Sequence, residues 1–260
     1  MKVKFSREEN IIKPCDLEDF DFQLDPYIGC EHGCSYCYTQ NHTDLNWESE
    51  IEIYEKLEEI LSKEFSSIEP QKIYMGMETD PYQPLEEEYE QTRKVLEVLN
   101  ELGFSVSILT KSDLVVRDID LLKKMGDASV GTSIAFQDDD QKKLFEKCTS
   151  PNKDRYRALA KFKEEDIDTY ALICPVIPFI TDTKALINEV QPFVDRIWIY
   201  PLEIKSTEDK NWEKVHSIID EHFPEILTDL EKIVLSTDSP YWERLSARLE
   251  KESKDLKIDL

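Results

Sequence analysis

Three cysteines, Cys30, Cys34 and Cys37, stand within eight residues of one another in a C-x3-C-x2-C spacing. Two of the chain's six glycines, Gly29 and Gly33, lie in the same loop. Glycine lets a backbone wrap closely around a ligand, and cysteine thiolates hold iron–sulfur clusters, usually in sets of four. A loop that supplies three thiolates leaves one iron open to a small molecule. The spacing therefore favours an iron–sulfur cluster with one open position.

Two other kinds of site fit the same cysteines. Cys15, or His32 or His42, can complete a tetrahedral zinc site, although only the last two loop cysteines have the C-x2-C spacing common in zinc sites. A thioredoxin-like C-x-x-C pair leaves the first loop cysteine unexplained. Zinc and redox-active thiols stay open as alternatives.

The composition limits the classes of partner. Hydrophobic residues make up 40% of the 260, enough for a sizeable core, and the formal net charge is −24. Nucleic-acid backbones and anionic membranes attract clustered positive charge, so nucleic acid is an improbable partner and no membrane is expected. The first ten residues lack the apolar segment of a signal peptide. The longest charge-free apolar stretch, 169–181, is too short to span a bilayer. We expect a cytoplasmic protein with reduced thiols.

Short apolar runs alternate with helical patterns along the chain. Such alternation indicates βαβ units and a mainly parallel sheet. We expect an α/β fold, a partial (β/α)6 TIM-like barrel, with an open doubly wound sheet as the alternative; in both, chemistry belongs at the carboxyl ends of the strands. We place an N-terminal extension at 1–19, the core at 20–205 and a C-terminal extension at 206–260. The apolar runs are 20–27, 72–77, 104–110, 128–136, 169–177, 196–202 and 232–236, and the helical patterns are 51–61, 89–102 ended by Gly103, 118–124, 138–146, 153–165, 182–190, 208–222 and 241–256.

The cysteine loop resembles a known signature. C-x3-C-x-aromatic-C is similar to the cluster motif of the radical S-adenosylmethionine (SAM) superfamily, and Asp-Pro-Tyr-Ile-Gly-Cys-Glu-His-Gly-Cys-Ser-Tyr-Cys-Tyr, 25–38, resembles its spore photoproduct lyase-like branch. Thr-Asp-Pro-Tyr-Gln-Pro at 79–84 resembles a second block of that branch. The resemblance runs from about residue 20 to 190, and weaker matches fall at 109–112, 116–118, 131–134 and 175–178.

The resemblance implies a barrel enzyme of the radical SAM type. By it, the loop cysteines ligate a [4Fe-4S] cluster, the open iron binds SAM, and reductive cleavage gives a 5′-deoxyadenosyl radical that takes hydrogen from a substrate the sequence does not identify. It also implies a reductant such as a ferredoxin or flavodoxin. Two alternatives remain: repair of a DNA photolesion, and an iron–sulfur or zinc protein without turnover.

The resemblance and the strand ends suggest roles for further residues, each of which also has a plain packing or turn interpretation. Tyr36 and Val176 would lie against the adenine, and the acceptor-rich segment 77–80 would receive the SAM ammonium. Ser133 would touch the ribose or the carboxylate, while Lys111 and Arg155 would neutralise a carboxylate. Cys148 is a candidate hydrogen donor, although a lone cysteine is more often a small hydrophobe. The cofactor-site candidates are Tyr36, Met77, Glu78, Thr79, Asp80, Lys111, Ser133, Arg155 and Val176.

The resemblance to spore photoproduct lyase stops at one point. That enzyme uses a cysteine hydrogen donor downstream of its cluster loop, and the corresponding segment here, 74–106, contains no cysteine. Together with the charge of −24, this favours a radical enzyme with a substrate other than DNA.

Overall fold

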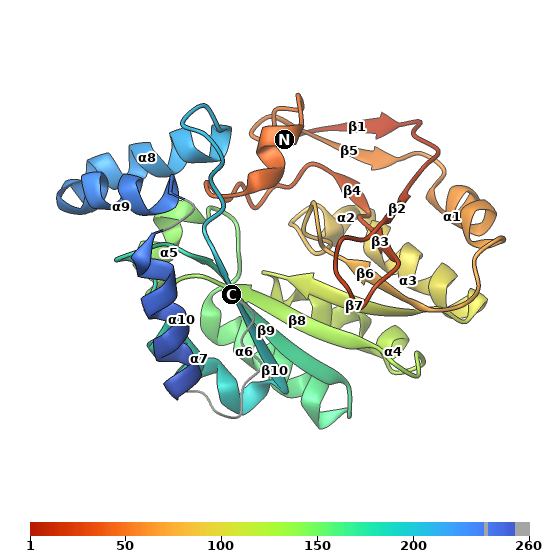
Figure 1. The fold of residues 1–260 in the computed structure, drawn as a ribbon. Helices are drawn as coiled ribbons and strands as arrows, with labels where there is room; N and C mark the ends of the chain where they lie inside the picture. Colours follow the sequence, from red (N-terminus) through yellow and green to blue (C-terminus); the bar gives the residue numbers. More distant parts are fainter. Residues whose placement is uncertain (237–238, 253–260) are drawn as a thin grey trace. The chain divides into compact units, whose positions relative to one another are not determined.

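The computed structural model describes residues 1–236 and 239–252 (Figure 1). The contacts divide the chain into two compact units. The first contains Met1–Gly33, Leu45–Thr132 and Cys148–Thr169, and the second contains Cys34–Asp44, Ser133–Lys147 and the described residues from Tyr170 onward. The chain thus passes from one unit to the other inside the cysteine loop. The predicted boundaries at 19/20 and 205/206 stay predictions.

The first unit contains a run of parallel strands, as the alternating pattern predicts. Strands β3 (Phe22–Leu24), β6 (Lys72–Met75), β7 (Ser105–Thr110) and β8 (Ser129–Ile134) pair in that order, and β2 (Ile12–Pro14) adds an antiparallel edge on β3. The register aligns Met75 with Ile108 and Thr110 with Thr132. The carboxyl ends of β6 and β7 therefore lie together.

Helices and a second small sheet complete the first unit. The helices are α1 (Leu57–Phe65), α2 (Glu86–Tyr89), α3 (Gln91–Leu102), α4 (Ile119–Leu122), α6 (Asn152–Glu164) and the 3-10 helix η2 (Asp113–Asp118). Gly103 ends α3 in the left-handed region, φ 77°, with its N–H on the last carbonyls of the helix, which confirms it as a helix stop. Parallel β1 (Lys2–Ser6) and β5 (Glu50–Tyr54), with antiparallel β4 (Tyr27–Ile28), form the small sheet.

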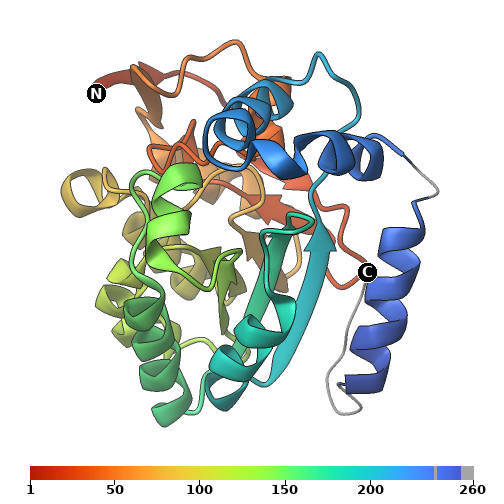
Figure 2. The same ribbon diagram turned by 90° about the vertical axis from the view of Figure 1, so that its left-hand side faces the viewer.

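The second unit contains β9 and β10 and the C-terminal helices. β9 (Asp168–Val176), which begins in the first unit, pairs in parallel with β10 (Arg196–Pro201). The 3-10 helices of this unit are η1 (Tyr38–His42), η3 (Gln191–Phe193) and η4 (Pro224–Ile226). Figure 2 shows α8 and α9 lying side by side. The α-helices are α5 (Asp139–Phe145), α7 (Thr183–Val190), α8 (Lys210–His222), α9 (Leu227–Val234) and α10 (Pro240–Glu252).

Two predicted elements are wrong. The helix expected over 51–61 is divided into β5 and α1, because Ile51 and Ile53 are buried in a period of two between half-buried glutamates. The strand expected over 232–236 lies mostly in α9, where Leu230 and Val234 are buried one helical turn apart. Both errors come from short apolar runs that fit either period.

In the described residues, no helix is both long enough and apolar enough to cross a bilayer.

Candidate active site around the cysteine loop

The first half of the cysteine loop belongs to the first unit and wraps tightly. Cys30 is buried, and Gly29 before it has φ 91°. A Cβ at Gly29 would lie 2.9 Å from Ile51 Cδ1 as well as adopting a conformation that side chains rarely take. The turn therefore requires a glycine, and the absence of a side chain also leaves room for Ile51.

The Gln83 side chain holds the backbone of this half of the loop through hydrogen bonds. It is fully buried, its Nε2 donates to the Gly29 carbonyl at 3.0 Å, and its Oε1 accepts the Glu31 N–H at 2.8 Å. The Glu31 carboxylate in turn accepts the Leu85 N–H at 2.7 Å. The Asp-Pro-Tyr-Gln-Pro block thus braces the backbone on both sides of the first cysteine.

The Asp80 carboxylate joins three segments. It accepts the Thr110 hydroxyl at 2.6 Å, the Lys111 N–H at 2.7 Å and the Tyr82 N–H at 2.9 Å. Its Oδ2 also lies 3.2 Å from Nε2 of His32. Burial opposes ionisation, but the charge of His32 and the hydrogen bonds outweigh it and hold the pKa of Asp80 well below its usual range.

His32 is itself buried between two partners. Its Nδ1 lies 2.8 Å from the Cys148 carbonyl oxygen, and its Nε2 faces Asp80. Both ring nitrogens therefore lie close to an acceptor oxygen. The backbone at Cys148 is thereby tied to the cysteine loop, while its thiol-bearing side chain is exposed.

Asp25 fixes the segment that follows β6. Its carboxylate accepts the Thr79 N–H at 3.0 Å and the Glu78 N–H at 3.2 Å. Burial raises the pKa of Asp25 to about 7 despite these bonds. The Glu78 carboxylate pairs with Lys13 at 2.7 Å, and the Thr79 hydroxyl donates to the Tyr27 carbonyl at 3.2 Å. The backbone of this acceptor-rich strand end is therefore held in place.

A buried network of charged residues in the first unit was not predicted from the sequence. Glu86 and Asp118 are fully buried, and Arg117 pairs with both. Arg93 binds Asp118 at 2.6 Å, and the Tyr27 hydroxyl donates to Glu86 at 2.5 Å. In the sequence, only the Val-Arg-Asp string at 116–118 pointed to this region, as a match to the family. It did not indicate which residues Arg117 and Asp118 contact.

The second half of the loop is anchored in the second unit. The Cys37 N–H donates to the Cys34 carbonyl at 3.2 Å, and the Gln40 amide donates to the same carbonyl at 2.7 Å. Tyr36 is buried, its ring lies 6.2 Å from that of Phe136, and its hydroxyl donates to the buried Glu146 at 2.5 Å. Much of the Tyr36 side chain is thus engaged in packing.

Asn211 is a further anchor that sequence reasoning missed. It is fully buried at the start of α8, and its Nδ2 donates to the Tyr36 carbonyl at 3.3 Å and to the Glu203 carbonyl at 3.1 Å. Its backbone N–H donates to the Asn41 side chain at 3.2 Å. Lys214, one turn on, binds Gln40 at 2.6 Å. Nothing in the spacing of these polar residues signals their contacts with the loop.

The remaining predicted residues are placed within each unit. The Ser133 hydroxyl donates to the Cys174 carbonyl at 3.2 Å, and Val176 is buried at the end of β9. Arg155 is buried, with Nε donating to the Ser150 carbonyl at 2.9 Å. Lys111 is half-buried and donates its N–H to Asp80. Among the first-unit candidates, the contacts bring the 77–80 segment and Lys111 to one edge; Ser133 and Val176 belong to the second unit.

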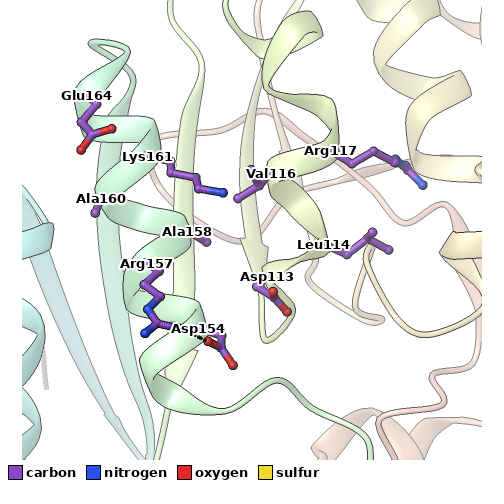
Figure 3. A pocket seen from close by; sticks show the side chains of 10 residues that line it. All are labelled: Asp113, Leu114, Val116, Arg117, Asp154, Arg157, Ala158, Ala160, Lys161 and Glu164. Carbon is purple, nitrogen blue, oxygen red and sulfur yellow. Dashed lines mark hydrogen bonds and ion pairs between the residues drawn. The ribbon is translucent and has the colours of Figure 1, made fainter.

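A cavity of about 620 Å³ lies between η2 and α6 in the first unit (Figure 3). Arg157 and Lys161 of α6 line it, opposite Asp113 and Arg117 of η2. Arg157 pairs with Asp154 at 3.0 Å. No predicted cofactor-site residue lines this cavity.

The donor set fits a metal–sulfur cluster. Within the described residues no group of three metal-ligating side chains is gathered, and the loop cysteines are divided, Cys30 in one unit and Cys34 and Cys37 in the other. The six cysteines all lie within the described residues and form no disulfide. Three buried donors near them in sequence lack a partner in the described part of the chain: the Ser35 and Thr39 hydroxyls and the Trp47 indole N–H. Unpaired buried donors call for an acceptor, and cluster sulfur atoms accept hydrogen bonds.

The comparisons with other proteins agree with this donor set. The family model of the Radical SAM superfamily matches residues 24–188. An uncharacterized protein of Methanocaldococcus jannaschii is 34% identical over 175 residues, which cover 66% of each chain. An uncharacterized protein of Mycobacterium tuberculosis is 27% identical over 175 residues, 63% of this chain and 52% of its own length. The chain thus spans about half to two thirds of these relatives.

Solved structures share the fold. A mutant of spore photoproduct lyase with a dinucleoside spore photoproduct has a TM-score of 0.70 at 14% identity, covering 98% of this chain and 80% of that chain. SuiB of Streptococcus suis, bound to S-adenosylmethionine, has a TM-score of 0.55 at 14% identity, covering 93% of this chain and 50% of that chain. At such identities the likeness concerns the fold alone, and it confirms the predicted α/β fold of the partial TIM-barrel type. The family match over most of the chain shows that the protein belongs to the radical SAM superfamily.

Proposed function

We propose that the protein is a radical SAM enzyme whose Cys30, Cys34 and Cys37 ligate a [4Fe-4S] cluster. When bound, this cluster supplies the electron that cleaves S-adenosylmethionine to a 5′-deoxyadenosyl radical, which takes hydrogen from the substrate. The observation that carries the proposal is the cysteine loop, with its C-x3-C-x2-C spacing inside the family-matched region. The brace from Gln83 to Gly29 and Glu31 supports it, because a ligand loop must be held in shape before the cluster binds.

The chain's own residues would position the cofactor at the strand ends. Segment 77–80 would take the SAM ammonium. Because the Asp80 and Asp25 carboxylates already accept protein N–H and O–H groups and Glu78 already pairs with Lys13, the backbone carbonyls of the segment are its best acceptors. Lys111, Ser133 and Arg155 would bind the carboxylate or ribose. Tyr36 and Val176 would contribute an apolar edge to the adenine site.

Cys148 is the proposed hydrogen donor to the substrate radical. Its thiol is exposed, and the bond from its carbonyl to His32 fixes the backbone beside the cysteine loop. A ferredoxin or flavodoxin in the cytoplasm would supply the electron.

Repair of a DNA photolesion is a second candidate, favoured by the likeness to a spore photoproduct lyase mutant solved with a dinucleoside spore photoproduct. The net charge of −24 opposes it, because DNA binding requires clustered positive charge. A cluster- or zinc-carrying protein without turnover is a third. Salt-dependent binding to an ultraviolet-irradiated oligonucleotide would favour the repair function.

The test is anaerobic reconstitution with iron and sulfide, followed by dithionite and SAM and chromatography for 5′-deoxyadenosine. We expect about four irons per chain, the content of one [4Fe-4S] cluster, and 5′-deoxyadenosine from the wild type. Cys30→Ala, Cys34→Ala and Cys37→Ala should each lose the cluster, while the matched control Cys15→Ala should retain it. Tightly bound zinc, or a cluster that never cleaves SAM, would contradict the enzyme proposal.

A further inference from the structure

Trp47 is held in a rigid turn between the cysteine loop and β5. The Ser49 N–H and the Glu50 N–H both donate to the Asn46 carbonyl, at 3.0 and 2.9 Å, and the Glu48 N–H donates to the Asn46 side chain at 3.1 Å. The Lys2 N–H then ties the Ser49 carbonyl to β1 at 2.8 Å. The turn and the adjoining strand therefore give the indole a defined position.

The indole N–H of Trp47 is buried without a partner in the described part of the chain. Trp47 is 7% exposed, and its Nε1 makes no hydrogen bond within the described residues. A buried donor left unpaired is costly. A hydroxyl can rotate toward another acceptor, but an indole N–H is fixed in the plane of its ring. It can therefore be satisfied only by an acceptor that lies in that plane.

The Trp47 ring lies beside the backbone that precedes the first cysteine. A Cβ built on Gly29 would lie 3.1 Å from Trp47 Cδ1, the ring carbon bonded to Nε1. Gly29 has φ 91°, and Gln83 holds its carbonyl. Cys30, the next residue, is 8% exposed. The unpaired donor and the buried thiol thus belong to one packed region of the first unit.

We propose that the Trp47 indole N–H donates a hydrogen bond to sulfur of the cluster held at Cys30, as a positioning residue that tunes the reduction potential. This inference rests on the proposed function, since it requires the cluster. Sulfur that carries more electron density in the reduced state accepts a stronger hydrogen bond. An N–H donor therefore stabilises the reduced cluster and raises its potential.

The experiment compares reconstituted wild type, Trp47→Phe and Trp47→His. The readouts are the reduction potential from a spectroelectrochemical titration and the exchangeable-proton and nitrogen couplings of the reduced cluster, measured by pulsed electron–nuclear double resonance on protein with indole-¹⁵N tryptophan. We expect Trp47→Phe to shift the potential to more negative values and to lose the ¹⁵N coupling. Trp47→His, which keeps a ring N–H, should recover part of the potential.

Trp198→Phe is the control, because Trp198 lies on β10 of the second unit and packs against Tyr170 rather than against the loop cysteines. It should leave the potential and the couplings unchanged. A wild-type potential and an unchanged ¹⁵N coupling in cluster-loaded Trp47→Phe would overturn the inference and leave the proposed function standing. A wild type that binds no iron–sulfur cluster would overturn both. If Trp47→Phe fails to take up a cluster while Trp47→His does, the N–H donor is required and the inference holds.

Discussion

Asp80 and His32 face each other in the first unit, with 3.2 Å between the carboxylate Oδ2 and the ring Nε2. One residue follows β6 and the other lies two positions after the first loop cysteine, so this contact joins the strand end to the loop. The other donors to Asp80 come from its own turn and from the end of β7. The Asp80 carboxylate therefore links the cysteine loop to the ends of β6 and β7.

Asp80→Asn should destabilise the protein by about 1–3 kcal/mol, the usual cost of leaving a buried hydrogen-bond donor without its acceptor. The amide also presents an N–H₂ group where two donors now meet one oxygen. Urea unfolding of the cluster-free protein measures the change. Asp127→Asn is the control, because Asp127 is exposed and pairs with Lys72 at the surface. A loss below about 1 kcal/mol for Asp80→Asn would contradict the linking role of this carboxylate.

The fold could be predicted from the sequence further than the site could. The alternation of apolar and amphipathic segments is a repeating signal, and it anticipated most helices and strands. The errors at β5 and α9 fall where a short apolar run fits both periods. The cysteine loop was found because metal-ligand chemistry restricts both residue type and spacing.

The supporting contacts could not be predicted, because they join residues distant in sequence. Gln83 reaches Gly29 across 54 positions, and Asn211 reaches Tyr36 across 175. A single glutamine or asparagine carries no periodic signal, and its role depends on tertiary placement. Asp80 was identified by resemblance as a cofactor residue, and only the structure reveals that protein donors surround its carboxylate.

Gln83→Ala should loosen the cysteine loop. It leaves the Gly29 carbonyl and the Glu31 N–H without their partners, at a cost of about 1–3 kcal/mol for each buried group. Hydrogen exchange followed by mass spectrometry should show faster exchange in residues 29–33. The control, Gln71→Ala, changes a half-buried glutamine beside the start of β6, and loop exchange should match the wild type. If residues 29–33 were equally protected from exchange in both variants, the hydrogen bonds of Gln83 would not be what holds the loop.

Asp25 should make stability fall as pH rises. Its folded pKa of about 7 lies above the ordinary value near 3.9, so the folded protein holds a proton that the unfolded chain releases. Stability from this group is complete below about pH 4 and is lost as the pH approaches 7, on the order of 4 kcal/mol in total. The pKa of Asp80 is lowered, so this group acts in the opposite direction. Its contribution to the stability of the protein is lost in acid.

Asp25→Asn should remove this dependence, because the amide oxygen can still accept the Thr79 N–H while the titrating proton is gone. The free energy of unfolding at pH 5 and pH 8 measures it for both proteins. Between pH 5 and pH 8, the free energy of unfolding of the variant should rise by a few kcal/mol relative to that of the wild type. A difference between the proteins that does not change with pH would show that Asp25 titrates normally.

Gly76→Ala should be severely destabilising. Gly76 has φ 104°, and an added Cβ would meet the Leu109 carbonyl oxygen at 2.3 Å. Backbone strain alone costs about 1–3 kcal/mol, and the clash with β7 adds to it. Gly103→Ala separates the two effects, because Gly103 has φ 77° but open space around it. Thermal or urea unfolding should rank the variants Gly103→Ala above Gly76→Ala; equal losses would show that the close approach to β7 does not matter.

Asn211→Ala should release the second half of the cysteine loop. The variant loses the bonds to the Tyr36 and Glu203 carbonyls, which are worth about 1 kcal/mol each and more when the acceptor stays buried. We expect faster hydrogen exchange in residues 36–41 of the cluster-free protein and faster iron loss to a chelator from the reconstituted protein. Asn188→Ala, an exposed change on α7, should alter neither rate. Because Asn211 lies beyond the family-matched region, an effect on iron retention would show that α8 contributes to the stability of the cluster loop. Unchanged rates would show that the bonds of Asn211 do not hold the loop.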